Sequence, residues 1–192
     1  MRQNNRGRGS GPSSGIQGSH AADRSVKHSG QVFTPGFLVR NMLDYAGYVC
    51  GNILEKHIID NSCGAGAFLC EAVARYCSEY VANHDDNVGL KADLERFVHG
   101  IELDPVVCAD CRSNLDGIAK DFGVENVGWD LLNTNALSVT RYDGQMDFVV
   151  GNPPYVRVHN LEEDYDEVKS FRFAEGGMTD LYLAFYELGL RM

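Results

Sequence analysis

The chain has 192 residues, with 27 acidic and 17 basic side chains and a formal net charge of -10 at pH 7. Its length suits one domain with a real core. Its acidity argues against wide nonspecific wrapping of nucleic acid, although a local basic groove is still allowed. Because the sequence shows no apolar signal region and no membrane-length apolar run, we expect a cytoplasmic protein that binds no membrane.

Residues 1–29 differ in composition from the rest of the chain. They are rich in Gly, Ser, Asn and Arg and contain almost no large apolar side chain. Such a segment cannot bury enough surface to offset the entropy of ordering it. We therefore predict a disordered polar tail over residues 1–29 and one folded domain over residues 30–192.

The folded part should open with a helix. Thr34 is a good N-cap residue and Pro35 fits the first helical turn. Apolar residues then recur at helical spacing, at Phe37, Leu38, Met42, Leu43, Ala46 and Val49.

Helical and strand patterns alternate along the remaining chain. Buried strands are expected at residues 57–60, 97–104, 127–132 and 146–150. Helices are expected at about 67–81, 106–123 and 179–192, with a short helix within 85–97. In the last helix, one face should carry Leu181, Ala184, Phe185 and Leu188. This alternation predicts an α/β fold with a mostly parallel sheet and helices on both faces.

The six cysteines do not form a pattern typical of a metal site. Cys108 and Cys111 have the spacing of a ligand pair, but they lie in a helical pattern and no second pair has ligand spacing. The histidines form no ligand cluster either. We therefore expect buried or half-buried free thiols and no metal centre.

The segment "IIDNSCGAGAF" gives a strand, an acid, a tight loop and a helix. Gly64 and Gly66 allow a ligand to approach the backbone closely, and the helix directs its N–H groups at that ligand. Leu69 stands at the third glycine position of a dinucleotide fingerprint, so a pyrophosphate is disfavoured. Glu102, at the end of the next strand, suits a ribose diol. The glycine loop and Glu102 together favour an adenosine-containing ligand such as S-adenosylmethionine. The alternative is that Gly64 and Gly66 only make a turn and that Glu102 is a solvated charge at the end of a strand.

The segment "DFVVGNPPYVRV" carries the second candidate site. The side-chain oxygen of Asn152 and the carbonyl of Pro153 can accept hydrogen bonds from a planar amine, and the prolines stiffen that geometry. Tyr155 offers a face on which a flipped base could stack. The alternative is that two prolines merely end a strand. The absence of a Pro-Cys dipeptide argues against methylation of cytosine C5 through a cysteine nucleophile.

Taken together, "GQVFTP", "DNSCGAGAF", "GIELDP" and "DFVVGNPPYVRV" resemble the motifs of adenine-N6 DNA methyltransferases of restriction–modification systems. Their order is that of the γ group, and the resemblance covers about residues 29–192. It implies a Rossmann-like S-adenosylmethionine-dependent methyltransferase fold. It also implies transfer of a methyl group to N6 of a flipped adenine in double-stranded DNA.

The resemblance assigns roles to individual residues. Those that would bind the cofactor are Gln31, Thr34 and Pro35 at its methionine end, Asp60, Cys63, Gly64 and Gly66 as the main cradle, Glu102 at the ribose, and Asn135 at the adenine, with Asp130 as the alternative there. Those that would hold the target adenine are Asn152, Pro153, Pro154 and Tyr155. Asp180 would lie near this site or serve only the helix start.

The family normally continues through further strands and a DNA-recognition domain. We therefore expect an incomplete sheet, a truncated catalytic domain and an additional DNA-recognition region, with a cognate restriction nuclease as a further partner. Three alternatives stay open: an RNA-base methyltransferase, a protein-glutamine methyltransferase and a noncatalytic methylase-like subunit. The element Gln31–Pro35, placed ahead of the glycine loop, favours the DNA enzyme.

Overall fold

The computed structural model describes residues 34–155, 168, 170–174 and 181–192. The predicted tail, Gln31 and Asp180 lie outside the described residues. Among the described residues, no helix is long and apolar enough to cross a membrane.

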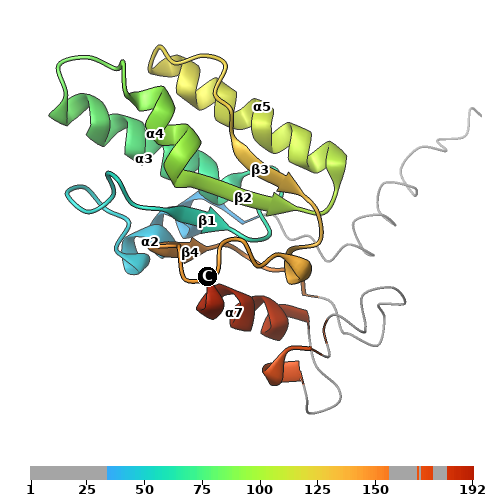
Figure 1. The fold of residues 1–192 in the computed structure, drawn as a ribbon. Coiled ribbons are helices and arrows are strands. Elements are labelled where there is room, and N and C mark those ends of the chain that lie inside the picture. Colours follow the sequence, from blue (N-terminus) through green and yellow to red (C-terminus); the bar gives the residue numbers. More distant parts are fainter. Residues whose placement is uncertain (1–33, 156–167, 169, 175–180) are drawn as a thin grey trace, which may run out of the picture.

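A parallel sheet forms the centre of the fold (Figure 1). Its four strands lie in the order β3-β2-β1-β4. They are β1 (Ile58–Asp60), β2 (Val98–Glu102), β3 (Asp130–Asn133) and β4 (Phe148–Val150). Each neighbouring pair is parallel. The predicted parallel α/β fold is therefore confirmed, and all carboxyl ends of the strands lie at one edge.

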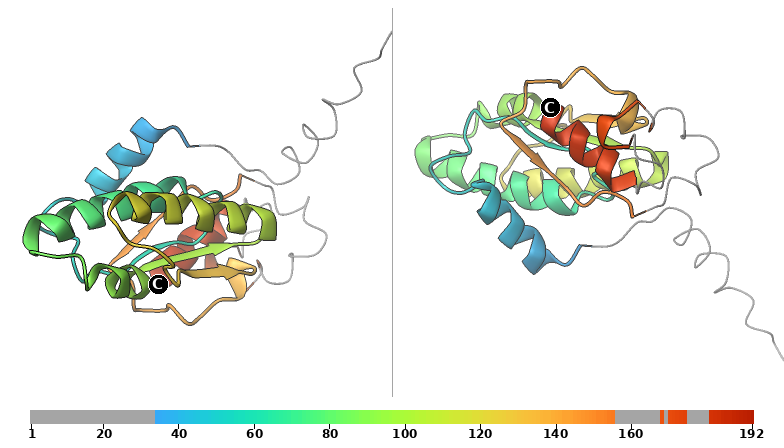
Figure 2. Two further views of the ribbon diagram at one scale, coloured as in Figure 1. Left: turned by 90° about the horizontal axis from the view of Figure 1, so that it is seen from above. Right: turned by 90° about the horizontal axis from the view of Figure 1, so that it is seen from below.

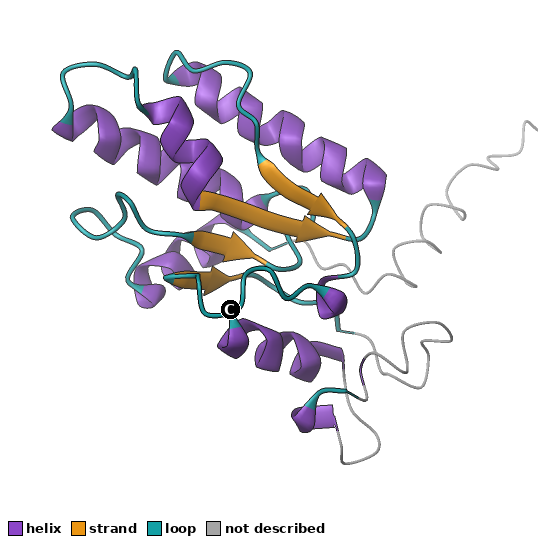
Figure 3. Cartoon of the chain, viewed as in Figure 1, coloured by secondary structure: helices purple, strands orange, loops and turns teal. Residues whose placement is uncertain are grey.

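Helices cover both faces of this sheet (Figures 1 and 3). One face carries α2 (Gly36–Ala46), α3 (Ala67–Asn83), α4 (Leu90–Phe97) and α5 (Pro105–Asp121). The other carries α7 (Leu181–Arg191) with the short helix η1 (Ala136–Ser138), and a second short helix, η3 (Arg172–Ala174), packs against α7. Seen along the sheet in Figure 2, α2 lies at the side of the molecule, beyond α3. Each helical layer has its own apolar cluster against the sheet.

The helix α5 shows how the sequence sets an element boundary. Asp104 is its N-cap, and the Asp104 carboxylate accepts hydrogen bonds from the backbone N–H groups of Val106 and Val107. Pro105, at the first helical position, lacks the N–H that would have no helical partner there. The helix therefore begins directly after the carboxyl end of β2.

The start of α2 differs from the prediction. The helix begins at Gly36, its N-cap is Pro35, and no side chain in the described part of the chain bonds the free backbone groups at that end. The prediction that Thr34 is the N-cap of this helix is therefore wrong. The predicted apolar stripe is also partly wrong, because α2 buries Val39 and Leu43 and leaves four of the predicted residues exposed, namely Phe37, Leu38, Met42 and Ala46. The predicted Val49 lies beyond the end of the helix and is exposed as well.

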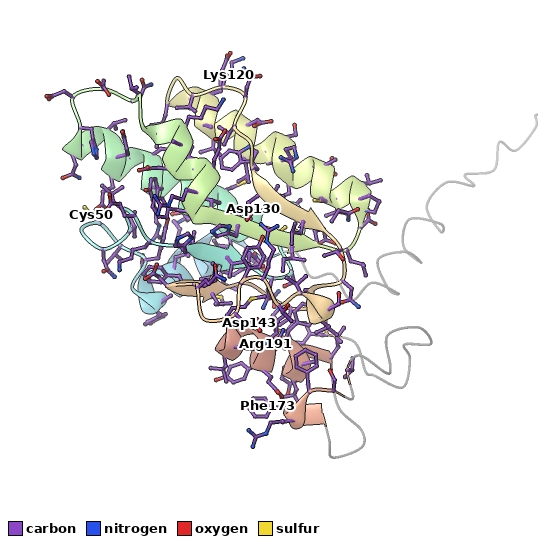
Figure 4. All side chains as sticks on the ribbon, viewed as in Figure 1. Cys50, Lys120, Asp130, Asp143, Phe173 and Arg191 are labelled. Atoms are coloured by element: carbon purple, nitrogen blue, oxygen red, sulfur yellow. The ribbon has the colours of Figure 1, made fainter. Side chains whose placement is uncertain are left out.

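The end of α7 is tied to the segment that leads into β4. Arg191 Nε donates to Asp143 Oδ1 at 3.0 Å, and both residues are marked in Figure 4. The carbonyl of Met192 accepts hydrogen bonds from Gln145 and Met146. Leu181, Ala184 and Leu188 are buried and Phe185 packs against the same cluster, as the helical pattern predicts.

Candidate functional site

Both candidate motifs lie at the carboxyl edge of the sheet. Asp60 ends β1, Glu102 ends β2, and Asn152 follows β4 by two residues. Because β1 lies between β2 and β4, the loops after all three strands are neighbours. In open α/β sheets this edge is where ligands bind.

The glycine loop is held by hydrogen bonds from β2. The backbone N–H of Gly64 donates to Glu102 Oε2 at 2.9 Å, and the N–H of Cys63 donates to the carbonyl of Ile101 at 2.9 Å. The other oxygen, Glu102 Oε1, accepts from the N–H of Asp104. A Cβ placed on Gly64 would meet no atom of the described residues within 4 Å. The loop therefore leaves open space beside a buried carboxylate, which suits a polar ligand with hydroxyl groups.

The other loop glycine, Gly66, serves the packing beneath the loop. Its φ is +90°, and a Cβ there would lie 2.8 Å from the sulfur of Cys111. The neighbouring Cys63 and Cys111 are buried, while Cys70 is half-buried. Burial raises the pKa of the Cys70 thiol to about 11. These cysteines are free thiols, as predicted, and among the described residues no group of His, Cys, Asp and Glu could hold a metal ion.

Asp60 connects the glycine loop with the Asn-Pro-Pro-Tyr segment. Its carboxylate is 1% exposed and accepts a hydrogen bond from the N–H of Ser62 at 3.0 Å. A Cβ on Gly151 would lie only 2.6 Å from Asp60 Oδ1. Burial raises the pKa of Asp60 to about 7; the Ser62 hydrogen bond opposes this, and the nearby charge of Glu102 adds to it. Asp60 thus titrates near neutral pH and touches both motifs.

The side chain of Asn152 is fixed from the other end of the chain. Asn152 Nδ2 donates to Thr34 Oγ1 at 3.2 Å. Thr34 is 9% exposed, and Asn152, Pro153 and Pro154 are half-buried. Since the amide nitrogen is used by Thr34, the amide oxygen is the end left to contact a ligand.

Tyr155 supplies an accessible aromatic ring beside these groups. It is 62% exposed, as a residue that stacks on an incoming base must be. Its ring centroid lies 6.2 Å from that of Tyr182 on α7, at an interplanar angle of 43°. A planar group bound over Tyr155 would therefore have a second aromatic ring nearby.

The two residues considered for the adenine of the cofactor have different surroundings. Asn135 follows β3 at the carboxyl edge, where its side chain caps η1 by accepting from the N–H of Leu137. Asp130 begins β3 and lies at the opposite edge, marked in Figure 4. It bonds His99 at 2.7 Å and also contacts Arg141. Asp130 precedes the carboxyl end of β3 by three residues, so its position does not support the alternative assignment, and the contact with the adenine of the cofactor stays a prediction for Asn135.

Three neighbours of the site were not found from the sequence. Ser62 has a buried hydroxyl oxygen with no partner among the described residues, Gly151 makes room for Asp60, and Tyr182 lies beside Tyr155. Ser62 and Gly151 stand within the quoted motifs, whereas Tyr182 lies on α7, outside them. Only Gly151 gave a usable signal, a glycine at the exact end of a strand.

The fold places this chain in a class before any family comparison. Parallel strands in this order, with a glycine loop after β1 and an acid at the end of β2, form a Rossmann-like fold that is similar to that of an S-adenosylmethionine-dependent methyltransferase. The family model described as N-6 DNA Methylase matches residues 19–185. The chain therefore belongs to the N-6 DNA methylase family, and the cofactor indicated by family and fold is S-adenosylmethionine.

Individual proteins agree with this placement. The chain is 28% identical over 177 residues to the Type II methyltransferase M.PaeR7I of Pseudomonas aeruginosa, covering 88% of this chain and 31% of the relative. The DrdV–DNA complex matches with a TM-score of 0.61 at 18% identity, covering 86% of this chain and 20% of the other. A class I S-adenosylmethionine-dependent methyltransferase from Listeria monocytogenes matches with a TM-score of 0.54 at 21% identity, and the match covers 88% of this chain and 46% of the other. The chain thus spans about a third of the length of the curated relatives it matches.

Proposed function

We propose that this chain is the cofactor-binding and catalytic part of a site-specific DNA methyltransferase that acts on adenine N6 in a restriction–modification system. The observation that carries the proposal is the placement of Asn152 and Tyr155 directly after β4, the neighbour of β1, which ends at the glycine loop. Membership of the N-6 DNA methylase family supports the same reaction.

The chain's residues divide between the two substrates. When bound, S-adenosylmethionine supplies an electrophilic methyl group. Glu102 would accept hydrogen bonds from its ribose hydroxyls, and the loop containing Asp60, Cys63, Gly64 and Gly66 would hold the rest of it. The buried carboxylates and the open space at Gly64 fit a cationic ligand that carries a diol. Pro35, Gln31 and Asn135 are proposed as further contacts, whereas Thr34, which the resemblance places at the methionine end of the cofactor, bonds Asn152 in the structure.

The second motif would bind the target base. The exocyclic amine of adenine is a poor nucleophile because its lone pair is delocalised into the ring. Asn152 Oδ1 and the carbonyl of Pro153 would accept hydrogen bonds from its two hydrogens and favour a tetrahedral nitrogen. Pro153 and Pro154 restrict the backbone that carries these acceptors. Tyr155 would stack on the flipped base, as enzymes that act on a base outside the helix require.

We further propose that the surface that reads the DNA sequence lies outside these 192 residues and that a restriction nuclease acts alongside. The net charge of -10 supports this, because tight DNA binding needs phosphate-neutralising cations. The greater length of the curated relatives supports it as well. Placement in the γ group stays a prediction.

Calorimetric titration of S-adenosylmethionine into the chain is the first test, because it does not depend on DNA recognition. Glu102→Ala should weaken binding at least tenfold, whereas Glu125→Ala, at an exposed carboxylate, should not. Methyl transfer to unmethylated genomic DNA, measured with this chain joined to the proposed DNA-recognition region, should yield N6-methyladenine, and Asn152→Ala should abolish it with cofactor affinity nearly unchanged. Equal loss of transfer and affinity, or a product methylated on RNA or on protein glutamine, would refute the proposal.

A further inference from the structure

The contact between Thr34 and Asn152 joins two segments that are 118 residues apart in the sequence. Thr34 precedes α2, and Asn152 follows β4. The hydrogen bond runs from Asn152 Nδ2 to Thr34 Oγ1 at 3.2 Å. Thr34 is not the N-cap of α2, so its hydroxyl does not serve to bond the backbone N–H groups at the start of that helix. A buried hydroxyl is thus directed at the amide that we assign to the target base.

An Asn side chain has two ends of similar size and opposite chemistry. The oxygen only accepts hydrogen bonds and the NH2 group only donates them, and rotation by half a turn exchanges their positions. An amine approaching the oxygen can form a hydrogen bond. The same amine approaching the NH2 group would set donor against donor. Catalysis at an amine therefore requires that the amide be held in one of its two orientations.

We infer that Thr34 is a positioning residue that holds the Asn152 amide with its oxygen directed at the target amine. In the structure the NH2 group is the end engaged by Thr34, which leaves Oδ1 for the substrate. Because a hydroxyl can also donate, the competing arrangement has Thr34 donating to Oδ1 and the NH2 group facing the site. The inference rests on the proposed function only for the identity of the substrate; the orientation is a property of the chain alone.

Nuclear magnetic resonance of the side-chain amide tests the orientation without catalysis. In uniformly 15N-labelled protein, the Asn152 NH2 pair is assigned by its loss in Asn152→Asp. We expect two well-separated proton shifts, with one proton exchanging slowly with water because it is bonded to Thr34. Thr34→Val keeps the shape but removes the hydroxyl, so the two shifts should converge and both protons should exchange rapidly. Thr34→Ser should restore the wild-type pattern, and Thr140→Val, at an exposed threonine, should leave it unchanged.

Methyl transfer and cofactor affinity provide the second readout. Thr34→Val should lower the transfer rate by about ten- to hundredfold, since misplacing one catalytic group by a small distance has effects of that size. Its affinity for S-adenosylmethionine should change by less than about twofold, and Thr34→Ser should recover most of the rate.

Two results would overturn the inference. One is an Asn152 NH2 pair with rapidly exchanging protons in the wild-type chain, which would mean that the opposite end of the amide contacts Thr34. The other is a loss of cofactor affinity in Thr34→Val as large as the loss of rate, which would assign Thr34 to the cofactor instead. If the wild-type chain neither binds S-adenosylmethionine nor transfers methyl groups, the proposed function fails, while the amide spectra still decide the role of Thr34.

Discussion

Replacing Asp60 by Asn should change how the stability of this protein depends on pH. The Asp60 carboxyl group is almost fully buried, and burial raises its pKa to about 7 from an ordinary value of 3.8. In the unfolded chain the same group returns to its ordinary pKa. The folded protein therefore binds a proton more tightly than the unfolded chain, which is the reverse of the usual behaviour of a carboxylate.

The sign and size of the effect follow from this difference. Because the folded state holds more protons between pH 3.8 and pH 7, the free energy of unfolding falls as the pH rises through that window and is flat on either side. At about 1.4 kcal/mol per pH unit, the free energy of unfolding falls by about 4 kcal/mol across the full window. Roughly 2–3 kcal/mol of this should be lost between pH 5 and pH 8. Asn at position 60 stays neutral throughout and should not show this loss.

Urea unfolding of the wild-type and Asp60→Asn chains, followed by circular dichroism from pH 5 to pH 8, measures the effect. The difference in unfolding free energy between them should shift by about 2–3 kcal/mol in favour of the variant across that range. Asp110→Asn, at an exposed carboxylate on α5, serves as the control. Curves that stay parallel for wild type and Asp60→Asn would show that Asp60 is ionised throughout and would refute the reasoning.

Two further predictions concern the sheet edges. Gly151→Ala should destabilise the fold by about 1–3 kcal/mol, because Gly151 has a φ of +148° and the new Cβ would lie 2.6 Å from Asp60 Oδ1. Gly117→Ala, in α5 with no atom within 4 Å of the new Cβ, should be neutral or stabilising; equal urea midpoints for both would contradict this. For Asp130, burial would raise the pKa, but hydrogen bonds led by that from His99 outweigh it and lower the pKa to about 2. Asp130→Asn should therefore lose about 2 kcal/mol at pH 7, and the loss should shrink as the pH falls from about 4 towards 2; a loss that does not depend on pH would argue against an ionic role.

The layers of the fold could be predicted because periodicity reports burial directly. Four apolar runs between helical patterns predicted the four strands. The predicted bounds followed the burial of side chains, whereas the observed bounds follow the pairing of the strands. The third was predicted over residues 127–132 and runs from Asp130 to Asn133. Val127 and Trp129 precede it and are buried in the helical layer without belonging to the strand. An apolar side chain near a sheet thus resembles a strand residue even when its backbone pairs with none.

The error in α2 has a different cause. Its sequence carries apolar side chains on more than one stripe of the helix, so helical periodicity was correct while the choice of the buried stripe was not. Val39 and Leu43 face the core, whereas Phe37 and Met42 are exposed. Which stripe is covered depends on where α3 and β4 lie, and that is tertiary information.

Thr34 shows why local rules failed at the candidate site in particular. A threonine ahead of a proline and an apolar helix is a strong N-cap signal, since capping satisfies a free backbone N–H. In the structure the hydroxyl bonds Asn152 instead, and the first turn of α2 lacks a side-chain cap. The helix thus forgoes a cap worth about 1 kcal/mol while the amide gains a fixed partner. A local preference given up for a contact between two motifs is typical of functional sites rather than of structural ones, and it supports the positioning role inferred for Thr34.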